Sequence, residues 1–514
     1  MASRTPIITA LCAAVFLCHA EPPTAGRLPP AVSNAFHRIS PDSLKGHLSF
    51  LASDLLEGRN TPSRGLDIAA EYIAAQFRRA GLDPIPGTDS YFQTARWKYK
   101  TVPASAIAMS FEGSGVRIEL DGTRFTIPDP QARDIRGAAV YKTSLDKPGR
   151  LNALAEGSLE GRVVLLTAPS PSRMGVYARR LEDLERQMER LRPAAALIVR
   201  KGSVGGGVRG QLIDPEDGRT PRRERDSGFL AVYSDELAAA FESLPEGETT
   251  AKVSLRIPEP GEAPVELKNV IGILPGSDPE LKDTYVLVTA HYDHIGTTAP
   301  EDGDGIYNGA NDDGSGTVSV IEIASAMAAM EQRPRRTVVF MTVFGEEQGL
   351  LGDYYYARHP VFPLEKTIAD INLEHMGRTD DSEGPHANSL WMTGYDYSNI
   401  LDVFAAAGRM TGVTIQKNEG NSDAFFGRSD NAAYAEAGIP AHTFCAVFLF
   451  PDYHGLGDEW RKIDYGNMAR LARTVLAAVW TLAERSEVPH WNSQNTKTER
   501  YREARQSGGN KVNP

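Results

Sequence analysis

The stretch TVVFMTVFGEEQGLLG (Thr337–Gly352) is an apolar run that ends in two adjacent glutamates and a glycine-rich turn. A short continuous apolar run of this kind is typical of a strand that is buried on both faces. Charged side chains are rarely buried unless they are paired or bound to a metal ion. Glu346 and Glu347 therefore form either an ordinary solvated turn or a pair of carboxylates with different tasks.

Similar apolar runs on both sides of this stretch predict the fold class. TYVLVTA (284–290) precedes it and TIADINL (367–373) follows it, while the helical segment TVSVIEIASAMAAM (317–330) lies between the first two runs. Strands that alternate with helices form mainly parallel sheets with helices on both faces. We therefore expect an α/β fold with a mixed, mainly parallel sheet, and we assign its main part to residues 263–487.

Residues 120–262 predict a smaller, inserted domain. Two short apolar strands, GRVVLLTAP and AAALIVRKG, flank the segment VYARRLEDLERQMERLR, in which Leu181, Leu184, Met188 and Leu191 share one helical face. A strand, a helix and a second strand, followed by a glycine-rich and charged loop, indicate a β-rich α/β unit. Residues 31–119 would then form the N-terminal part of the main domain, with a helix that ends at Gly81.

The two ends of the chain predict export and a disordered tail. Residues 1–20, MASRTPIITALCAAVFLCHA, combine an early arginine, an apolar stretch and small residues at the end. This pattern is that of a secretory signal peptide, which is too short to span a membrane, although a buried N-terminal helix is the alternative reading. We expect a secreted or periplasmic protein. The polar tail 488–514 is expected to be disordered.

The overall composition limits the classes of partner. A length of 514 residues suits two domains, and a net charge of -12 argues against binding to nucleic acid. No later segment is long and apolar enough to be a transmembrane segment. Once the signal peptide is removed, Cys445 is the only cysteine, so the mature monomer has no internal disulfide. Its apolar surroundings favour a core position over a nucleophile.

Polar residues that can bind metal ions follow the predicted strands. In a parallel sheet, functional sites gather at the carboxyl ends of the strands. Histidine nitrogens and carboxylate oxygens suit Zn²⁺, and an aspartate can bridge two ions. Any single residue of this kind is more often part of a turn, so it is the joint pattern that indicates a site. The residues are His291 and Asp293, Asp312 and Asp313, Glu346 and Glu347, Glu374 and His375, and His454.

Other catalytic signatures are missing from the sequence. There is no HExxH, so the zinc-binding helix of many metalloproteases is excluded. There is no GxSxG elbow and no Walker loop, because GRSDN and DDGSG both fail the serine pattern. The sequence therefore favours a metal site that is assembled from several strand ends.

Five motifs in this order resemble the secreted di-zinc exopeptidase family, which includes bacterial leucyl aminopeptidases and glutamate carboxypeptidases. The motifs are HYDHIG, GANDDGSG, GEEQGLLG, NLEHMG and DYHG. The early segment LASDLLEGR, together with AAEYIAAQFRRAGL, is similar to the N-terminal helix region of the same family. The insert at 120–262 resembles a protease-associated domain. The resemblance covers most of the mature chain, and the five motifs are specific as a set.

The resemblance implies a site with two Zn²⁺ ions. Asp312 would bridge the ions, His291 and Glu374 would complete the shell of one, and Glu347 and His454 that of the other. Asp293 would hydrogen-bond to the His291 imidazole and set its tautomer. Glu374 departs from the pattern, since many relatives have aspartate there, which puts the geometry of that ion in doubt.

The same resemblance assigns different tasks to the two glutamates. Consecutive residues that leave a strand point to opposite sides, so Glu347 would ligate zinc while Glu346 acts as general base on the attacking water. Tyr453 would donate a hydrogen bond to the oxyanion, unless it only packs beside His454. His294 and Asp313 are interpreted as loop stabilisers, and Ser429 and Asp430 as structural or cleft-lining residues.

The implied activity is that of an aminopeptidase acting on peptide substrates. A glutamate carboxypeptidase-like enzyme or a dipeptidase is the alternative within the same chemistry, and it would need a cationic pocket for the free carboxylate. Glutaminyl cyclisation and a non-catalytic scaffold are less favoured, because all five ligands and Glu346 are present. The sequence leaves the side-chain preference and the oligomeric state open.

Overall fold

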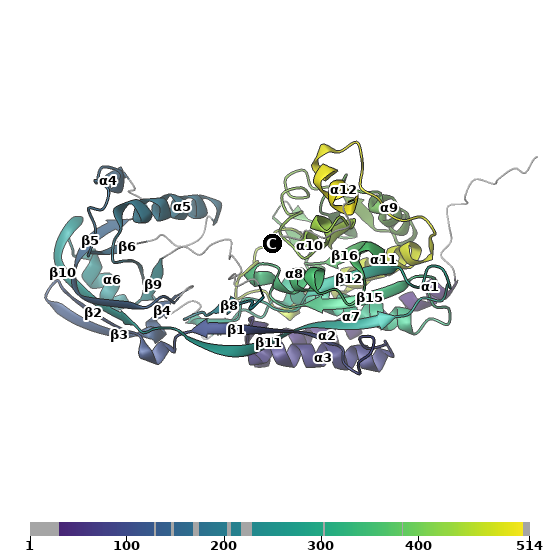
Figure 1. Cartoon of the computed structure of the whole chain (residues 1–514), viewed down its shortest axis with the longest axis horizontal. Helices are drawn as coiled ribbons and strands as arrows, with labels where there is room; N and C mark the ends of the chain where they lie inside the picture. Colours follow the sequence, from purple (N-terminus) through teal and green to yellow (C-terminus); the bar gives the residue numbers. More distant parts are fainter. Residues whose placement is uncertain are drawn as a thin grey trace, which may run out of the picture.

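The computed structural model describes residues 30–127, 130–144, 149–167, 174–202, 207–216, 229–301, 304–382 and 384–506. These residues form a large and a small body, which lie side by side and are joined by long strands (Figure 1). The predicted signal peptide at 1–20 lies outside the described residues. None of the helices in the described ranges is both long and apolar enough to cross a membrane.

The large body is built on a nine-stranded mixed sheet with a parallel centre. Its central strands β15, β12, β16 and β21 run parallel to one another. Antiparallel pairs flank them, β15 with β11 on one side and β21 with β19 on the other. In sheet order the strands are β20 (Thr414–Gln416), β19 (Ser389–Met392), β21 (Ala441–Cys445), β16 (Thr367–Leu373), β12 (Tyr285–His291), β15 (Thr337–Val343), β11 (Gly261–Leu274), β1 (Phe92–Thr101) and β8 (Gln211–Ile213).

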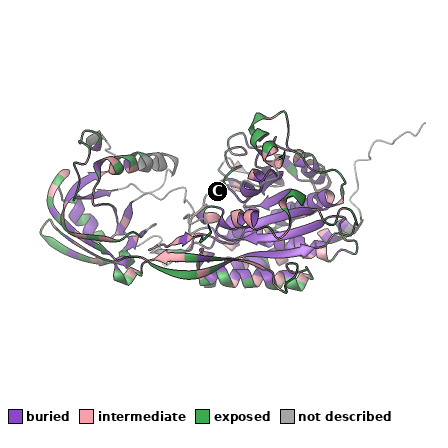
Figure 2. Cartoon of the chain, viewed as in Figure 1, coloured by how far each residue is buried: buried purple, intermediate pink, exposed green. Residues whose placement is uncertain are grey.

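Helices cover both faces of this sheet, which confirms the predicted α/β fold and explains the continuous apolar runs (Figure 2). In β15, Val338 and Phe340 belong to the hydrophobic core on one face. Val339 and Met341 belong to the core on the other face, because side chains alternate along a strand. The first core includes α2 (Pro41–Leu51), α3 (Arg64–Ala80), α7 (Ser315–Ala328), α9 (Ile400–Thr411) and α11 (Tyr465–Glu484). The second includes α8 (Leu351–Arg358), α10 (Asn431–Glu436) and α12 (Glu499–Gln506).

The small body contains the predicted strand, helix and strand within an eight-stranded sheet. The helix is α5 (Met174–Leu191), and a shorter helix, α6 (Asp235–Glu242), follows later. On α5, Leu184 and Leu191 are buried, as expected, while the side chain of Leu181 lies outside the described residues. In sheet order the strands are β3 (Val116–Asp121), β2 (Ala108–Gly113), β10 (Gly247–Ile257), β5 (Arg133–Ser144), β6 (Val163–Thr167), β7 (Ala195–Arg200), β9 (Leu230–Tyr233) and β4 (Phe125–Thr126).

The small body begins earlier than the predicted boundary at residue 120. β2 and β3 pair with each other, and β2 also pairs with β10, so both belong to the second sheet. Val102 and Ile107 already lie in the core of that sheet. The sequence did not reveal this boundary because these short strands carry no long apolar run.

Segments of the small body also reach the large sheet. β1 and β11 pair over ten residues between Phe92 and Thr101. β8, from within the insert, adds an edge strand to β1. Arg358 at the end of α8 forms an ion pair of 2.8 Å with Asp214, directly after β8. The insert is therefore tied to the large sheet by both backbone pairing and charge.

The C-terminal tail, predicted to be disordered over 488–514, is ordered as far as residue 506. The Trp491 indole donates a hydrogen bond of 2.9 Å to the Gly438 carbonyl. Its ring stacks on Tyr501 of α12 at a centroid distance of 5.0 Å. Both aromatic side chains are buried in the second core, so the tail has apolar anchors despite its polar composition. Residues 507–514 lie outside the described residues.

Candidate metal centre

The carboxyl ends of the central strands gather a cluster of histidines and carboxylates. His291 is the last residue of β12, and Glu374 directly follows β16. Glu346 and Glu347 lie in a short 3₁₀ turn after β15 rather than in the strand itself. Gly345 makes this turn possible, because its φ of 72° is disfavoured for residues with a side chain and an added Cβ would lie 2.9 Å from Leu351. We call this cluster the metal centre, and its members are His291, His294, Asp312, Glu346, Glu347, Glu374, His375 and His454.

The first group in the metal centre surrounds Oδ2 of Asp312. His454 Nε2 lies 3.0 Å from this oxygen and 3.2 Å from Glu347 Oε2. His294 Nδ1 lies 2.8 Å from Glu347 Oε1 and 3.8 Å from Asp312 Oδ2. One ligand atom from each of these four residues lies within 4.8 Å of the others.

The second group surrounds Oδ1 of the same aspartate. His291 Nε2 lies 3.4 Å from Asp312 Oδ1 and 3.8 Å from Glu374 Oε1. His375 Nε2 lies 3.5 Å from Asp312 Oδ1, and Glu346 Oε2 lies 3.9 Å from His291 Nε2. Asp312 thus offers one oxygen to each group, which is the arrangement of a bridging carboxylate.

The separations of the donor atoms suit shared coordination of divalent ions better than direct hydrogen bonds between the side chains. Tetrahedral ligands at 2.0–2.2 Å from zinc lie roughly 3.3 to 3.6 Å apart, close to the separations of His291 Nε2 from Asp312 Oδ1 and of His454 Nε2 from Glu347 Oε2. Several buried donor atoms also lack a hydrogen-bond partner among the described residues. They are the Nε2 atoms of His291, His294 and His375. Buried polar atoms without partners are costly, and metal ions would satisfy these.

The electrostatics of the cluster also favour the binding of cations. Burial opposes the charge on His454, but Glu347 and Asp312 outweigh it and raise the pKa of His454 to about 11. Asp312 likewise raises the pKa of His375 to about 9 against the effect of burial. Burial raises the pKa of Glu346 well above its usual range, and the carboxylates of Glu347 and Glu374 add to this. The carboxylates therefore attract positive charge, which protons supply when no metal is bound.

Neighbouring residues fix the loop that presents Asp312. The Asp458 carboxylate accepts hydrogen bonds from the backbone N–H groups of Asn311 and Asp312 at 2.9–3.0 Å. The Asn311 side-chain oxygen accepts from the backbone N–H of Gly377 at 2.8 Å. Asp458 was not recognised from the sequence, since only the fold brings it beside this loop.

Asp293 makes contacts that differ from the expected ones. Its carboxylate accepts hydrogen bonds from the backbone N–H of Glu346 at 3.1 Å and from the Thr61 hydroxyl at 3.0 Å. The distance from His291 Nδ1 to Asp293 Oδ1 is 3.6 Å, whereas the Asp293 carbonyl lies 3.2 Å from the same nitrogen. Asp293 therefore holds the glutamate turn in place, and its backbone carbonyl is the nearer partner of the imidazole.

Two histidines join the cluster that the sequence analysis did not assign as ligands. His294, interpreted as a loop stabiliser, contacts Glu347 and packs its ring against Gly309. His375 follows Glu374 with a φ of 50°, and this turn brings its imidazole to Asp312. The signal in the sequence was that each histidine lies within a motif, His294 in HYDHIG and His375 in NLEHMG. Neighbours along an extended chain usually point apart, and only the backbone angles of these turns bring them together.

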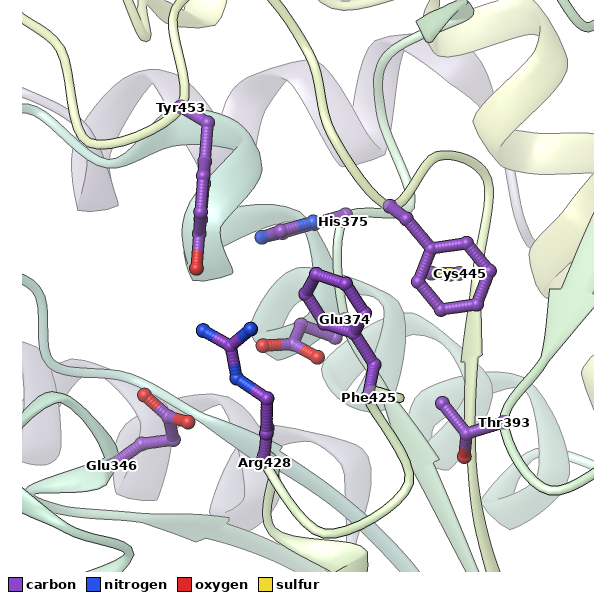
Figure 3. Close-up of a pocket in the computed structure, with 9 residues that line it drawn as sticks. Glu346, Glu374, His375, Thr393, Phe425, Arg428, Cys445 and Tyr453 are labelled. Atoms are coloured by element: carbon purple, nitrogen blue, oxygen red, sulfur yellow. The ribbon is translucent and has the colours of Figure 1, made fainter. Parts of the chain in front are cut away.

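Tyr453 lines an open pocket beside the metal centre (Figure 3). Its ring lies against that of His454 at a centroid distance of 4.2 Å, with the planes tilted by 33°, and its hydroxyl points into the pocket. Burial raises the pKa of Tyr453 well above its usual range, so the hydroxyl stays protonated and can donate a hydrogen bond. The remaining lining residues are Glu346, Glu374, His375, Thr393, Phe425, Arg428, Cys445 and Phe448.

Ser429 and Asp430, interpreted as structural or cleft-lining, are both buried. The Ser429 hydroxyl accepts a hydrogen bond of 2.8 Å from the Asn372 side chain. Asp430 faces Asp353, and two acceptor-only carboxylates can bond only if one holds a proton. Burial raises the pKa of Asp353 to about 7. The two residues therefore support the core beside the site rather than line the pocket.

This buried pair predicts a pH dependence of stability. Because the pKa of Asp353 rises from 3.8 unfolded to about 7 folded, its stabilising contribution is present below pH 3.8 and is lost as the pH rises through 7. Asp353→Asn carries no charge at residue 353 at any pH. The thermal midpoint of this variant, relative to that of the native protein, should therefore rise as the pH increases between these limits. The full difference is at most about 4 kcal/mol. Thermal unfolding of both proteins at pH 5 and pH 8 tests this, and an equal difference at both pH values would contradict it.

A family model matches the part of the chain that holds the metal centre. Residues 269–479 match the model described as "Peptidase family M28". A probable zinc metalloprotease of Pyricularia oryzae is 26% identical over 347 residues, which are 59% of this chain and 66% of the relative. A second one, from Pyrenophora teres f. teres, is 35% identical over 164 residues, 30% of this chain and 34% of the relative. The matches thus span less than two thirds of these curated relatives.

Solved structures share the fold over most of the chain. An aminopeptidase from Aneurinibacillus sp. strain AM-1 has a TM-score of 0.55 at 20% identity, with 89% of this chain and 97% of that chain covered. BSAP, a zinc aminopeptidase from Bacillus subtilis, has a TM-score of 0.59 at 18% identity, with coverages of 87% and 96%. At this level of identity the likeness establishes the fold, including both bodies.

Proposed function

We propose that this chain, whose residues 269–479 match the model of peptidase family M28, is a secreted zinc-dependent aminopeptidase. The observation that carries the proposal is the pair of side-chain groups that share the two oxygens of Asp312, with Glu346 beside them. His291 and Glu374 would hold one zinc ion, and His454 and Glu347 the other. His294 lies close to Glu347 and His375 close to Asp312, so these histidines either orient those ligands or serve as additional ligands of the zinc ions.

The residues around the ions divide the chemistry of peptide hydrolysis between them. When bound, zinc supplies Lewis acidity, which activates water and polarises the scissile carbonyl. Glu346 takes a proton from the attacking water and returns it to the leaving amine. The backbone contact from Glu346 to Asp293 fixes the turn that aims this carboxylate. The Tyr453 hydroxyl donates a hydrogen bond to the developing oxyanion.

The charges near the pocket bear on which end of the peptide is cleaved. Glu346 and Glu374 both line it and can accept the ammonium group of a peptide N-terminus. This favours an aminopeptidase among the activities with the same catalytic centre. The pocket also contains a cation, Arg428, which is the feature that a carboxypeptidase or a dipeptidase would need.

A mass-spectrometric time course tests the proposal. The zinc-supplemented protein is incubated with a free-ended peptide of mixed sequence and with its N-acetylated copy. We expect a ladder that shortens from the N-terminus of the free peptide and no cleavage of the blocked copy. The order of products reports the residue preference directly.

Two other outcomes would overturn the aminopeptidase assignment. Shortening from the C-terminus of both peptides would establish a carboxypeptidase. No cleavage at all would direct the search to dipeptides, to cyclisation of N-terminal glutamine, and finally to a scaffold role. In the last case, the insert would be tested for peptide binding.

A further inference from the structure

The pocket beside the metal centre is lined by both acidic and aromatic side chains. They include the carboxylates Glu346 and Glu374 of the metal centre and the rings of Phe425 and Phe448. The pocket encloses about 380 Å³ of space, including solvent at its mouth. Apolar walls alone would select an apolar residue, but the pocket also contains a guanidinium.

Arg428 points into the space between Glu346, Glu374 and Tyr453 (Figure 3). Its guanidinium carbon lies 4.6 Å from the centroid of the Phe425 ring. Within the described part of the chain, no carboxylate lies at ion-pair distance from Arg428, unlike Arg378, which pairs with both Asp380 and Asp452. An arginine with a ring as its partner keeps its hydrogen-bond donors available.

The turn that carries Arg428 is anchored on both sides. The backbone N–H of Arg428 donates to the Phe425 carbonyl at 3.1 Å. The Asn431 side chain donates to the Phe426 carbonyl at 2.9 Å, and Asn372 of β16 holds Ser429 at 2.8 Å. The guanidinium is therefore presented from an anchored turn.

Arg428 has no carboxylate partner at ion-pair distance among the described residues. The four carboxylates of the metal centre, Asp312, Glu346, Glu347 and Glu374, gather around the ion sites instead. Arg428 adds one positive charge to a pocket with aromatic walls. Guanidinium binds carboxylate through two parallel hydrogen bonds, and the exposed side chain of Arg428 is open to such a ligand. A substrate carboxylate is the chemical group that completes this pocket.

We propose that Arg428 selects substrates that carry a carboxylate next to the scissile peptide bond. This inference rests on the proposed peptidase function and narrows its substrate class. The carboxylate has two sources, either the side chain of an N-terminal glutamate or aspartate, or the free C-terminus of a dipeptide. In an N-terminal acidic residue, the ammonium would face Glu346 and Glu374 while the side chain reaches Arg428.

The test compares substrates that differ only in this charge. One pair is the anilides of glutamate and glutamine, and the other is a Leu-Gly dipeptide and its C-terminal amide. Each kcat/KM ratio is measured for the native protein, for Arg428→Gln and for Arg78→Gln. Arg78 is an exposed arginine on α3, and its guanidinium carbon lies 5.1 Å from the centroid of the Tyr91 ring. Its substitution therefore controls for the loss of a similar arginine side chain elsewhere in the protein.

We expect one ratio to favour the charged substrate by about 10- to 100-fold, the range of a hydrogen bond to a charged group. That ratio should fall to near one in Arg428→Gln and stay unchanged in Arg78→Gln. A preference for the glutamate anilide identifies the side chain as the source, and a preference for the free dipeptide identifies the terminal carboxylate. If both ratios survive in Arg428→Gln, or neither exceeds one in the native protein, the proposal is wrong.

A binding measurement separates this proposal from the peptidase assignment. Zinc-loaded Glu346→Gln is titrated calorimetrically with Glu-Leu-Gly and Gln-Leu-Gly, and with the Leu-Gly pair. The same titrations are repeated with Arg428→Gln added to that variant. A charge preference in binding that depends on Arg428 supports the selection even if the native protein hydrolyses no peptide. The same affinity for charged and neutral probes, or no binding of either, would overturn it.

Discussion

Glu346→Gln is expected to lower kcat by about 100- to 10,000-fold, the range over which a positioned general base accelerates proton transfer. Glutamine keeps the size of the side chain but cannot take a proton from water. The backbone of residue 346 keeps its hydrogen bond to Asp293, so the turn should be unchanged. Zinc content should therefore stay near that of the native protein, as measured by mass spectrometry of the metal.

The structure makes this zinc measurement decisive. Glu346 Oε2 lies 3.9 Å from His291 Nε2 and belongs to one of the groups that could hold an ion. If Glu346→Gln loses zinc together with activity, Glu346 is a ligand and the assignment of the glutamate pair is reversed. Glu347→Gln is the matched comparison, since the same chemical change one residue later should reduce zinc content.

Glu347→Ala is expected to weaken zinc binding by more than about 100-fold, because loss of a residue that only supports a ligand already costs 10- to 100-fold. The Glu347 carboxylate contacts His294 at 2.8 Å and His454 at 3.2 Å. Burial opposes its charge, but His454 and His294 prevail and lower the pKa of Glu347. Removal of the Glu347 carboxylate leaves Asp312 as the remaining carboxylate beside the imidazoles of His294 and His454.

The same substitution should also lower thermal stability at a fixed zinc concentration. Zinc that binds the folded state stabilises it according to its affinity, so weaker binding gives a smaller gain. The measurement is the thermal midpoint with zinc and with a chelator, next to zinc content after dialysis. The gain should nearly vanish in Glu347→Ala. Glu266→Ala, which removes an exposed ion pair with Arg96, should keep the full gain. A native zinc content in Glu347→Ala would show that His294 or another residue is the true ligand.

The predicted sheet and the gathering of the motifs follow from local properties of the chain. β12, β15 and β16 are apolar on both faces, so a sheet covered by helices was the consistent interpretation. Parallel neighbours bring their carboxyl ends to one edge, and the residues that follow these strands therefore meet. The separation of Glu346 from Glu347 was expected from strand geometry, yet a 3₁₀ turn produces it.

The errors arose where pairing partners are distant in the sequence. The tail was expected to be disordered because it is polar, but Trp491 and Tyr501 dock on the second core. The small body starts before residue 120 because its first strands gain their partners from β10, far along the chain. Composition does not report such long-range contacts.

The sequence by itself determined the α/β class, the strands whose ends carry the chemistry, and the motifs that hold the candidate metal ligands, because each depends on local periodicity and residue type. Tertiary structure alone decided which oxygen of Asp312 each group shares, how His294 and His375 join the cluster, and how Arg428 reaches the same pocket as Thr393 and Tyr453. These contacts depend on backbone angles in turns, such as the positive φ of Gly345 and His375, and on the packing of segments that are remote in the sequence. A pattern of residues reports which groups are present, whereas only the folded chain sets the distances on which metal binding and substrate selection depend.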